Sequence, residues 1–158
     1  VPEVRKAARE QLREGADMFK IFTTGGVMSE RDTPTACQYS MDEIRAFVEE
    51  AKNAGVRAGT HALGTQGIKN AVLAGIDNVD HGVYLDDEVI ELMAVVCATR
   101  NNAIVLGLQD ELGTLEAGKQ ADLIFIDGDP LADISVLRDR DKILAVYKGG
   151  QAATRMPF

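Results

Sequence analysis

The sequence predicts an α/β fold with a parallel sheet in its first half and a β-rich second half. Three stretches share one pattern, in which a glycine that ends a helix precedes a short apolar strand and then a residue able to bind metal. They are residues 15–20, 55–61 and 75–81. After Gly107 the helical pattern gives way to short apolar runs bounded by turn residues. These two observations predict parallel βα units followed by a separate β segment.

The helices of the first half have clear sequence signals. One begins after Pro2, a residue favoured at the first helical position, and another begins at a capping box made by Ser40 and Glu43. A shorter helix is expected at 65–74. The helix after the capping box has an apolar face formed by Ile44, Phe47, Val48 and Ala51. Each helix therefore has one side suited to packing on the sheet.

Two connections separate these elements. After the first strand, the Gly25-Gly26 pair lets the backbone approach a ligand closely, although a simple tight turn explains it equally well. Residues 30–39 lack periodicity, as in a long loop that covers an active site.

After the third strand, helical sequence capped by Asp86 or Asp87 runs to Gly107, with a phase shift near Ala94 and Val95. The predicted divisions are 1–94, a connecting helix at 95–107, and 108–158.

Composition limits the classes of function. A chain of 158 residues with 46% apolar content can bury one sizeable core. A net charge of -8 argues against nucleic acid or an anionic membrane as a partner. Cys37 and Cys97 have no metal or disulfide spacing, which favours a reducing cytoplasm, and no apolar run reaches membrane-span length. The start at Val1 rather than Met suggests a fragment, a processed chain or a trimmed chain.

Lys20, His61 and His81 end the three repeated stretches. Because the carboxyl ends of parallel strands meet at one edge, we expect these side chains to point into one site. A single histidine at the end of a buried strand more often has a structural role than a metal-binding one. However, the chain has only two histidines, and both occupy the same position in a repeated unit, which favours a metal site.

Lys20 needs a separate argument because an ammonium ion cannot bind a cation. A neutral lysine amine can add carbon dioxide to give a carbamate, whose oxygens can bridge two metal ions. The alternative is a lysine that extends from the strand to water, and the physics of the residue alone favours that alternative. A metal held here would acidify water and polarise a scissile carbonyl, which suits amide or ester hydrolysis.

Five stretches carry a resemblance to a known family: residues 15–29, 60–64, 79–82, 113–130 and 146–150. Together they cover most of the chain, and they resemble the amidohydrolase superfamily of metal-dependent hydrolases. Within it they are most similar to the imidazolonepropionase-related branch, which includes Xaa-Pro dipeptidase-like and arginine carboxypeptidase-like members. The resemblance implies units like strands four to six of a (β/α)₈ TIM-type barrel, followed by part of a small β-sandwich.

The resemblance also implies site residues and chemistry. Lys20 matches the family's carboxylated lysine on strand four, and His61 and His81 match metal ligands on strands five and six. The implied cofactor is one or two divalent metal ions, with zinc favoured. The implied reaction is hydrolysis of C-N bonds in dipeptide-like or other small amide substrates.

Two family features are absent from the sequence. The His-x-His pair of strand one and the aspartate of strand eight have no counterpart, so no catalytic general base is assigned and the substrate-binding residues are unknown. Open barrel edges would favour homo-oligomers. Two hypotheses follow: a metal-dependent hydrolase, incomplete in this chain, or a non-catalytic remnant that retains only weak metal binding.

Overall fold

The structure, a computed structural model, describes residues 1–28 and 32–153. The chain divides into two compact units, Val1–Val89 and Ile90–Phe158. Each unit contains one three-stranded sheet, so the α/β class with a β-rich second half is confirmed. The finer division at 94 and 107 stays a prediction.

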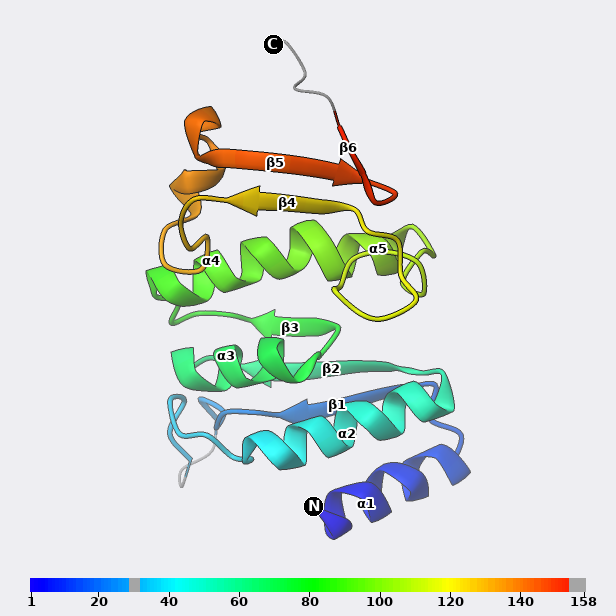
Figure 1. Ribbon diagram of the computed structural model, residues 1–158. Coiled ribbons are helices and arrows are strands. Elements are labelled where there is room, and N and C mark those ends of the chain that lie inside the picture. The colour runs from blue at the N-terminus through cyan, green and yellow to red at the C-terminus, as the bar shows by residue number, and fades with distance from the viewer. Residues whose placement is uncertain (29–31, 154–158) are drawn as a thin grey trace. The chain divides into compact units, whose positions relative to one another are not determined.

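The first unit alternates helices with parallel strands. Its elements are α1 (Pro2–Arg13), β1 (Met18–Phe22), α2 (Met41–Ala54), β2 (Arg57–Ala62), α3 (Thr65–Ala74) and β3 (Asn78–His81), as Figure 1 shows. The strands pair in the order β1-β2-β3, and both pairings are parallel. The repeated pattern thus predicted all three strands of this sheet.

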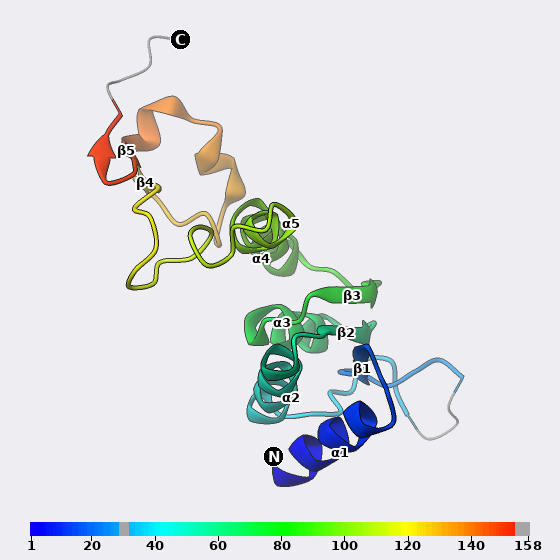
Figure 2. The ribbon, with the colours of Figure 1, turned by 90° about the vertical axis from the view of Figure 1, so that its right-hand side faces the viewer.

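Helices α2 and α3 lie on one face of this sheet (Figure 2). The predicted capping box starts α2, since the Ser40 side chain accepts from the Glu43 amide and the Glu43 side chain accepts from the Ser40 amide. The predicted apolar face is buried at Ile44, Phe47, Val48 and Ala51. The opposite face of the sheet is more open, because Met18 is 46% and Phe22 51% exposed.

The loop after β1 folds back on itself. Thr24 and Cys37 form an isolated antiparallel bridge, and the Gly25 amide donates to the Ala36 carbonyl at 3.1 Å. Residues 30 and 31 of the predicted loop lie outside the described residues. The described parts bring the glycine pair to the carboxyl end of the sheet.

Helix α4 (Asp87–Val96) crosses the division between the units and is capped as predicted, with Asp86 accepting from the Val89 amide at 2.9 Å. A π-helical turn, Cys97–Asn101, and a short helix α5 (Asn102–Val105) follow it. A π turn adds a residue to a helical turn and so changes the helical phase. It begins just after the phase shift that the sequence predicts.

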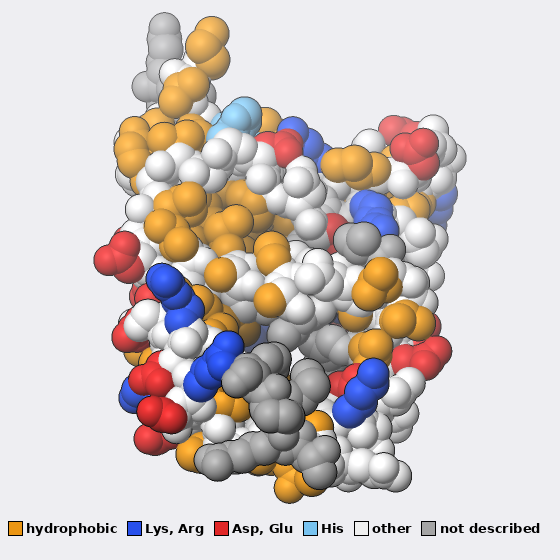
Figure 3. Space-filling view, turned by 90° about the horizontal axis from the view of Figure 1, so that it is seen from above, with side chains coloured by type: hydrophobic (Ala, Val, Ile, Leu, Met, Phe, Trp, Pro, Cys, Tyr) orange, Lys and Arg blue, Asp and Glu red, His pale blue; other side chains and the backbone are white. Residues whose placement is uncertain are grey.

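The second unit holds an antiparallel sheet. Its strands β4 (Leu123–Ile126), β5 (Ile143–Lys148) and β6 (Gln151–Ala152) pair in chain order, and two 3₁₀ turns, Ile134–Leu137 and Arg140–Lys142, lie between β4 and β5. Ile124 and Leu144 are 60% and 66% exposed, and Figure 3 shows hydrophobic side chains gathered on the face that it displays. Within the described residues, no helix has the length and apolar character to cross a membrane.

Candidate functional site

The strand register of the first sheet places a row of side chains on its open face. Phe19 is 3% exposed and faces the helices, so the alternation along β1 turns Lys20 and Phe22 to the open side. Phe22 is opposite His61 on β2, and His61 is opposite Asp80 on β3. The carboxyl ends of three strands therefore contribute to one surface.

His61 is held between two rings. The Phe22 ring stacks on it with centroids 4.5 Å apart, and the His81 ring approaches edge-on at 4.7 Å. Its Nε2 atom lies 3.4 Å from the Gly25 carbonyl oxygen, and the residue is only 8% exposed. The two histidines are thus neighbours, and His61 has little freedom to turn.

His81 reaches this position through an uncommon backbone conformation. Its φ is 77°, and among the described residues it is the one residue other than glycine with a positive φ. Regular alternation along a strand places consecutive residues, such as Asp80 and His81, on opposite faces of the sheet. Here Asp80 contacts Lys20 while the His81 ring also meets His61, which belongs to the same row of side chains.

Lys20 forms an ion pair instead of facing the two imidazoles. Its Nζ lies 2.5 Å from Oδ2 of Asp80, and the Asn78 side-chain amide donates to the other Asp80 oxygen at 2.6 Å. These hydrogen bonds, that of Lys20 first, lower the pKa of Asp80, while partial burial opposes the effect. The predicted trio is therefore only partly assembled, with the histidines together and the lysine engaged by Asp80.

Buried threonines fix the strand ends that carry the histidines. The Thr60 hydroxyl accepts from the Thr23 amide at 3.1 Å and lies within hydrogen-bond distance of the Ile21 and His61 carbonyls. Thr24 accepts from the Leu63 amide at 2.9 Å. These threonines were not predicted as part of the site. Their position at the strand ends was the available signal, but nothing in the sequence distinguishes a buried threonine from an exposed one.

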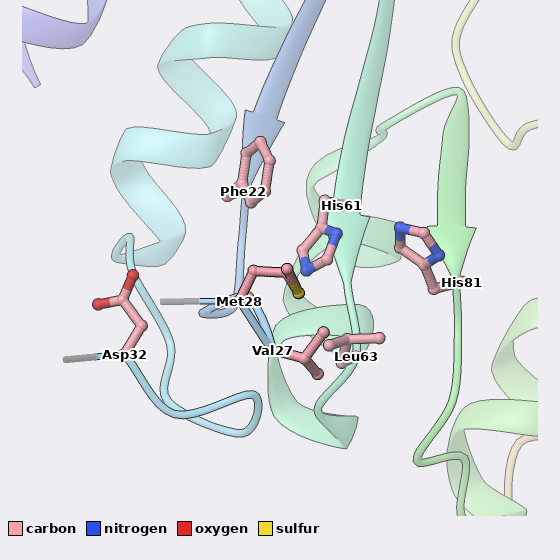
Figure 4. Close-up of a pocket in the computed structure, with 8 residues that line it drawn as sticks. Phe22, Val27, Met28, Asp32, His61, Leu63 and His81 are labelled. Carbon is pink, nitrogen blue, oxygen red and sulfur yellow. The ribbon is translucent and has the colours of Figure 1, made fainter. Parts of the chain in front are cut away.

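A cavity of about 550 Å³ opens in front of the two imidazoles (Figure 4). Met28 points its sulfur toward the His61 ring, while Asp32 lies on the side away from His81. The described lining residues are Phe22, Gly26, Val27, Met28, Asp32, His61, Leu63 and His81. A volume of this size falls in the range of small-ligand sites.

The imidazole pair fits two ligands of a divalent metal, because both rings are neighbours and offer nitrogen donors. Lys20 does not complete the set in this arrangement, since its amine is paired with Asp80. Among residues 1–28 and 32–153, no three histidine, cysteine, aspartate or glutamate side chains are grouped to hold a metal ion. The described residues thus bring two imidazoles together without a third grouped donor.

Comparison with known families and sequences gives a consistent result. A family model described as "Amidohydrolase family" matches residues 1–97 and 90–153, and the two matched segments overlap at residues 90–97. An Aspergillus niger ochratoxinase is 43% identical over 93 residues, which cover 59% of this chain and 19% of that protein. A Moorella thermoacetica 5-methylthioadenosine/S-adenosylhomocysteine deaminase is 65% identical over 34 residues, 22% of this chain and 8% of its own length.

Solved structures show the same relationship. A Xaa-Pro dipeptidase with methionine bound in its active site aligns with a TM-score of 0.57 and 25% identity, over 96% of this chain and 58% of that one. The A. niger ochratoxinase structure aligns with a TM-score of 0.56 and 25% identity, over 96% and 54%. The chain therefore spans little more than half the length of these solved relatives and 19% of the curated ochratoxinase.

Proposed function

This chain belongs to the amidohydrolase family, and we propose that it provides part of a metal-dependent site that hydrolyses amide C-N bonds in small, dipeptide-like substrates. The observation that carries the proposal is the contact between His61 and His81, the two histidines of the chain, at adjacent parallel strand ends beside a ligand-sized cavity. The names of two relatives, a Xaa-Pro dipeptidase and an ochratoxinase, support a hydrolase of this kind.

The proposal includes the architecture of the complete site. The parallel order β1-β2-β3 suits three consecutive units of a (β/α)₈ barrel, and the antiparallel sheet suits part of a β-sandwich. In such a barrel the carboxyl ends of the strands form the active-site face. Phe22, His61 and His81 lie at that end of the first sheet.

The metal would be held by the imidazoles of His61 and His81 and by Lys20 as a carbamate, with zinc favoured by the nitrogen donors. When bound, a divalent metal supplies Lewis acidity, which acidifies water and polarises an amide carbonyl. The chain's own residues orient the site: Phe22 stacks on one ring, and Thr60 ties the end of β1 to β2. Lys20 must leave Asp80 before it takes the carbamate role.

A general base is not assigned to any residue of the chain. The family's strand-eight aspartate has no counterpart, so the second candidate is a non-catalytic chain that keeps only weak metal affinity. The Lys20→Ala variant separates the two candidates. Loss of amide hydrolysis supports the carbamate site, whereas activity unchanged by the substitution contradicts it.

Metal content tests the proposal most directly. We expect elemental mass spectrometry of protein purified without chelator or affinity-tag metal to give one or two equivalents per chain. The double variant His61→Ala, His81→Ala should lose the metal, while Lys52→Ala, a surface change on α2, should retain it. A folded wild-type chain without stoichiometric metal would contradict the hydrolase and leave the non-catalytic candidate.

The proposal also covers the cellular location and the oligomeric state of the protein. Cys37 and Cys97 are both exposed free thiols, which suits a reducing cytoplasm. The outer strands β1 and β3 of the parallel sheet offer free edges within the described chain, and we propose these edges as contacts in a homo-oligomer.

A further inference from the structure

The cavity beside the histidines has mainly apolar walls and one acidic side chain. Apart from the imidazoles, its described walls are formed mainly by Phe22, Val27, Met28 and Leu63. Asp32 is the one other ionisable side chain among the described lining residues. An anionic group placed in this cavity would meet the Asp32 carboxylate, which repels it.

We propose that this cavity is a specificity subsite, which takes an uncharged apolar substituent next to the scissile amide and rejects an acidic one. The inference rests on the proposed function, because the amide itself is placed at the histidines. Apolar walls favour apolar groups by removing their surface from water, and the Asp32 carboxylate repels anions. Phe22 and Met28 are the residues that set this preference.

A second cavity beside the first indicates where the polar part of the substrate would bind. It has a volume of about 240 Å³ and shares Phe22, Gly26 and Asp32 with the first. Its remaining described walls are polar or small: Thr24, Gly25, Gln38 and Tyr39. Phe22 therefore borders both cavities. The second cavity has the more polar walls, so it suits the polar part of a substrate better.

Met28 is suited to contact the apolar substituent. It is 95% exposed, and its sulfur points toward His61 across the cavity mouth. An unbranched thioether adapts its shape to different apolar groups. Because the side chain is so exposed, it can be replaced without disturbing the core, which separates a loss of binding from a loss of folding.

The test compares three matched probes, the N-acetyl amides of leucine, aspartate and glycine, with the full chain. Amide NMR shifts of Gly26 and Leu63 report the affinity at this cavity in every variant. We expect the leucine probe to bind about tenfold or more tightly than the other two. Met28→Glu should weaken leucine-probe binding about tenfold, whereas Met28→Leu and the remote surface change Leu73→Glu should preserve it.

Equal affinities for the leucine and aspartate probes, or an unchanged affinity in Met28→Glu, would overturn the subsite. Failure of the proposed function gives a different result. Selective binding without metal uptake or hydrolysis keeps the apolar subsite and removes the hydrolase. Hydrolysis with no preference among the three side chains keeps the hydrolase and removes the subsite.

Discussion

Lys20 has two competing roles at the candidate site, the ion pair with Asp80 and the proposed carbamate. Its amine is paired with Asp80 at 2.5 Å, while the proposed function needs a carbamate on the same nitrogen. A carbamate is an anion, so it would lie beside the Asp80 carboxylate, and like charges at such a distance repel each other. Asp80 therefore disfavours the modification for as long as it stays near Lys20.

We expect Asp80→Asn to increase the carbamate on Lys20 several-fold, because the substitution removes the repelling charge and keeps the shape. Carbon-13 NMR in labelled bicarbonate measures the carbamate directly. Lys20→Ala is the control that identifies the signal among the other lysines. Equal carbamate in wild type and Asp80→Asn would show that the ion pair has no influence on the modification.

The sequence predicted some residues of the site better than others. His61 and His81 were identified because both end a repeated apolar strand, and the structure brings their rings together. Phe22 was missed, although the alternation of β1 places it on the same face as Lys20. The backbone conformation of His81 was not predicted, because a φ of 77° at a histidine leaves no mark in the sequence.

At the scale of elements, α1 is held to α2 through one buried carboxylate. Glu50 is 5% exposed and accepts hydrogen bonds from Arg9 at 2.7 and 2.8 Å and from Arg5 at 2.9 Å. These bonds, those of Arg9 first, lower the pKa of Glu50 from 4.5 to about 2. The helix is thus attached by charge as well as by its apolar side.

The pKa of Glu50 predicts a pH dependence of stability. Because the folded pKa is depressed, this contribution is fully present above pH 4.5 and is lost as the pH falls toward 2. We expect Glu50→Gln to cost roughly 1–2 kcal/mol at pH 6, with solvent screening at the exposed Arg9 included, and much less at pH 2.

Urea unfolding at the two pH values measures the difference. Glu49→Gln is the matched control, because Glu49 is 58% exposed and its pairing with Arg5 is screened by water. A stability difference between wild type and Glu50→Gln that stays constant with pH would contradict the role given to this carboxylate.

Helix α3 approaches the strand ends at a glycine. A Cβ added to Gly67 would lie 2.2 Å from Thr24 Cγ2 and 3.0 Å from the Thr23 carbonyl oxygen. Alanine normally stabilises a helix interior by about 1 kcal/mol relative to glycine. Here we expect Gly67→Ala to destabilise the chain by about 2 kcal/mol, because the contact forces Thr24 to move.

Denaturant unfolding tests this close approach. Gly26→Ala is the control at the same end of the sheet, because a Cβ there meets nothing within 4 Å. We expect a change below about 0.5 kcal/mol for that variant. If Gly67→Ala were instead the more stable protein, helix propensity would outweigh the contact and the packing argument would be wrong.

Elements with local signals were predicted well. The capping box at Ser40 and Glu43 and the apolar face of α2 are both present, because caps and helical periodicity depend on residues a few positions apart. The π turn at Cys97–Asn101 was not predicted, although the sequence shows a change of helical phase near Ala94 and Val95. Its hydrogen-bond pattern depends on competing turns of nearly equal energy, which a sequence pattern cannot rank.

At the scale of the whole molecule, the sequence predicted two kinds of sheet but not how a barrel or sandwich would close. The described strands form two separate three-stranded sheets, and closure needs strand partners that repeated local patterns do not specify. Open faces follow from this arrangement. Phe22 on the first sheet and Ile124 on the second are both more than half exposed.

The two units differ in how much apolar core they contain. Among the described residues, fifteen of the buried apolar side chains belong to Val1–Val89, and three belong to the rest of the chain: Leu92, Ala103 and Val136. Because burial of apolar surface is the main favourable term in folding, the second unit has less to offset its conformational entropy. We therefore expect two unfolding transitions, with the second unit opening at lower denaturant.

Hydrogen exchange followed by mass spectrometry assigns each transition to a unit. Ile44→Ala should lower only the later transition, by about 3 kcal/mol, because Ile44 is fully buried in the first core. Val136→Ala should lower only the earlier one, and by less. A single transition that both variants shift equally would mean that the units fold cooperatively. In that case the exposed apolar face of the second sheet would be a surface that the chain tolerates in its native state, rather than the sign of a weakly stable unit.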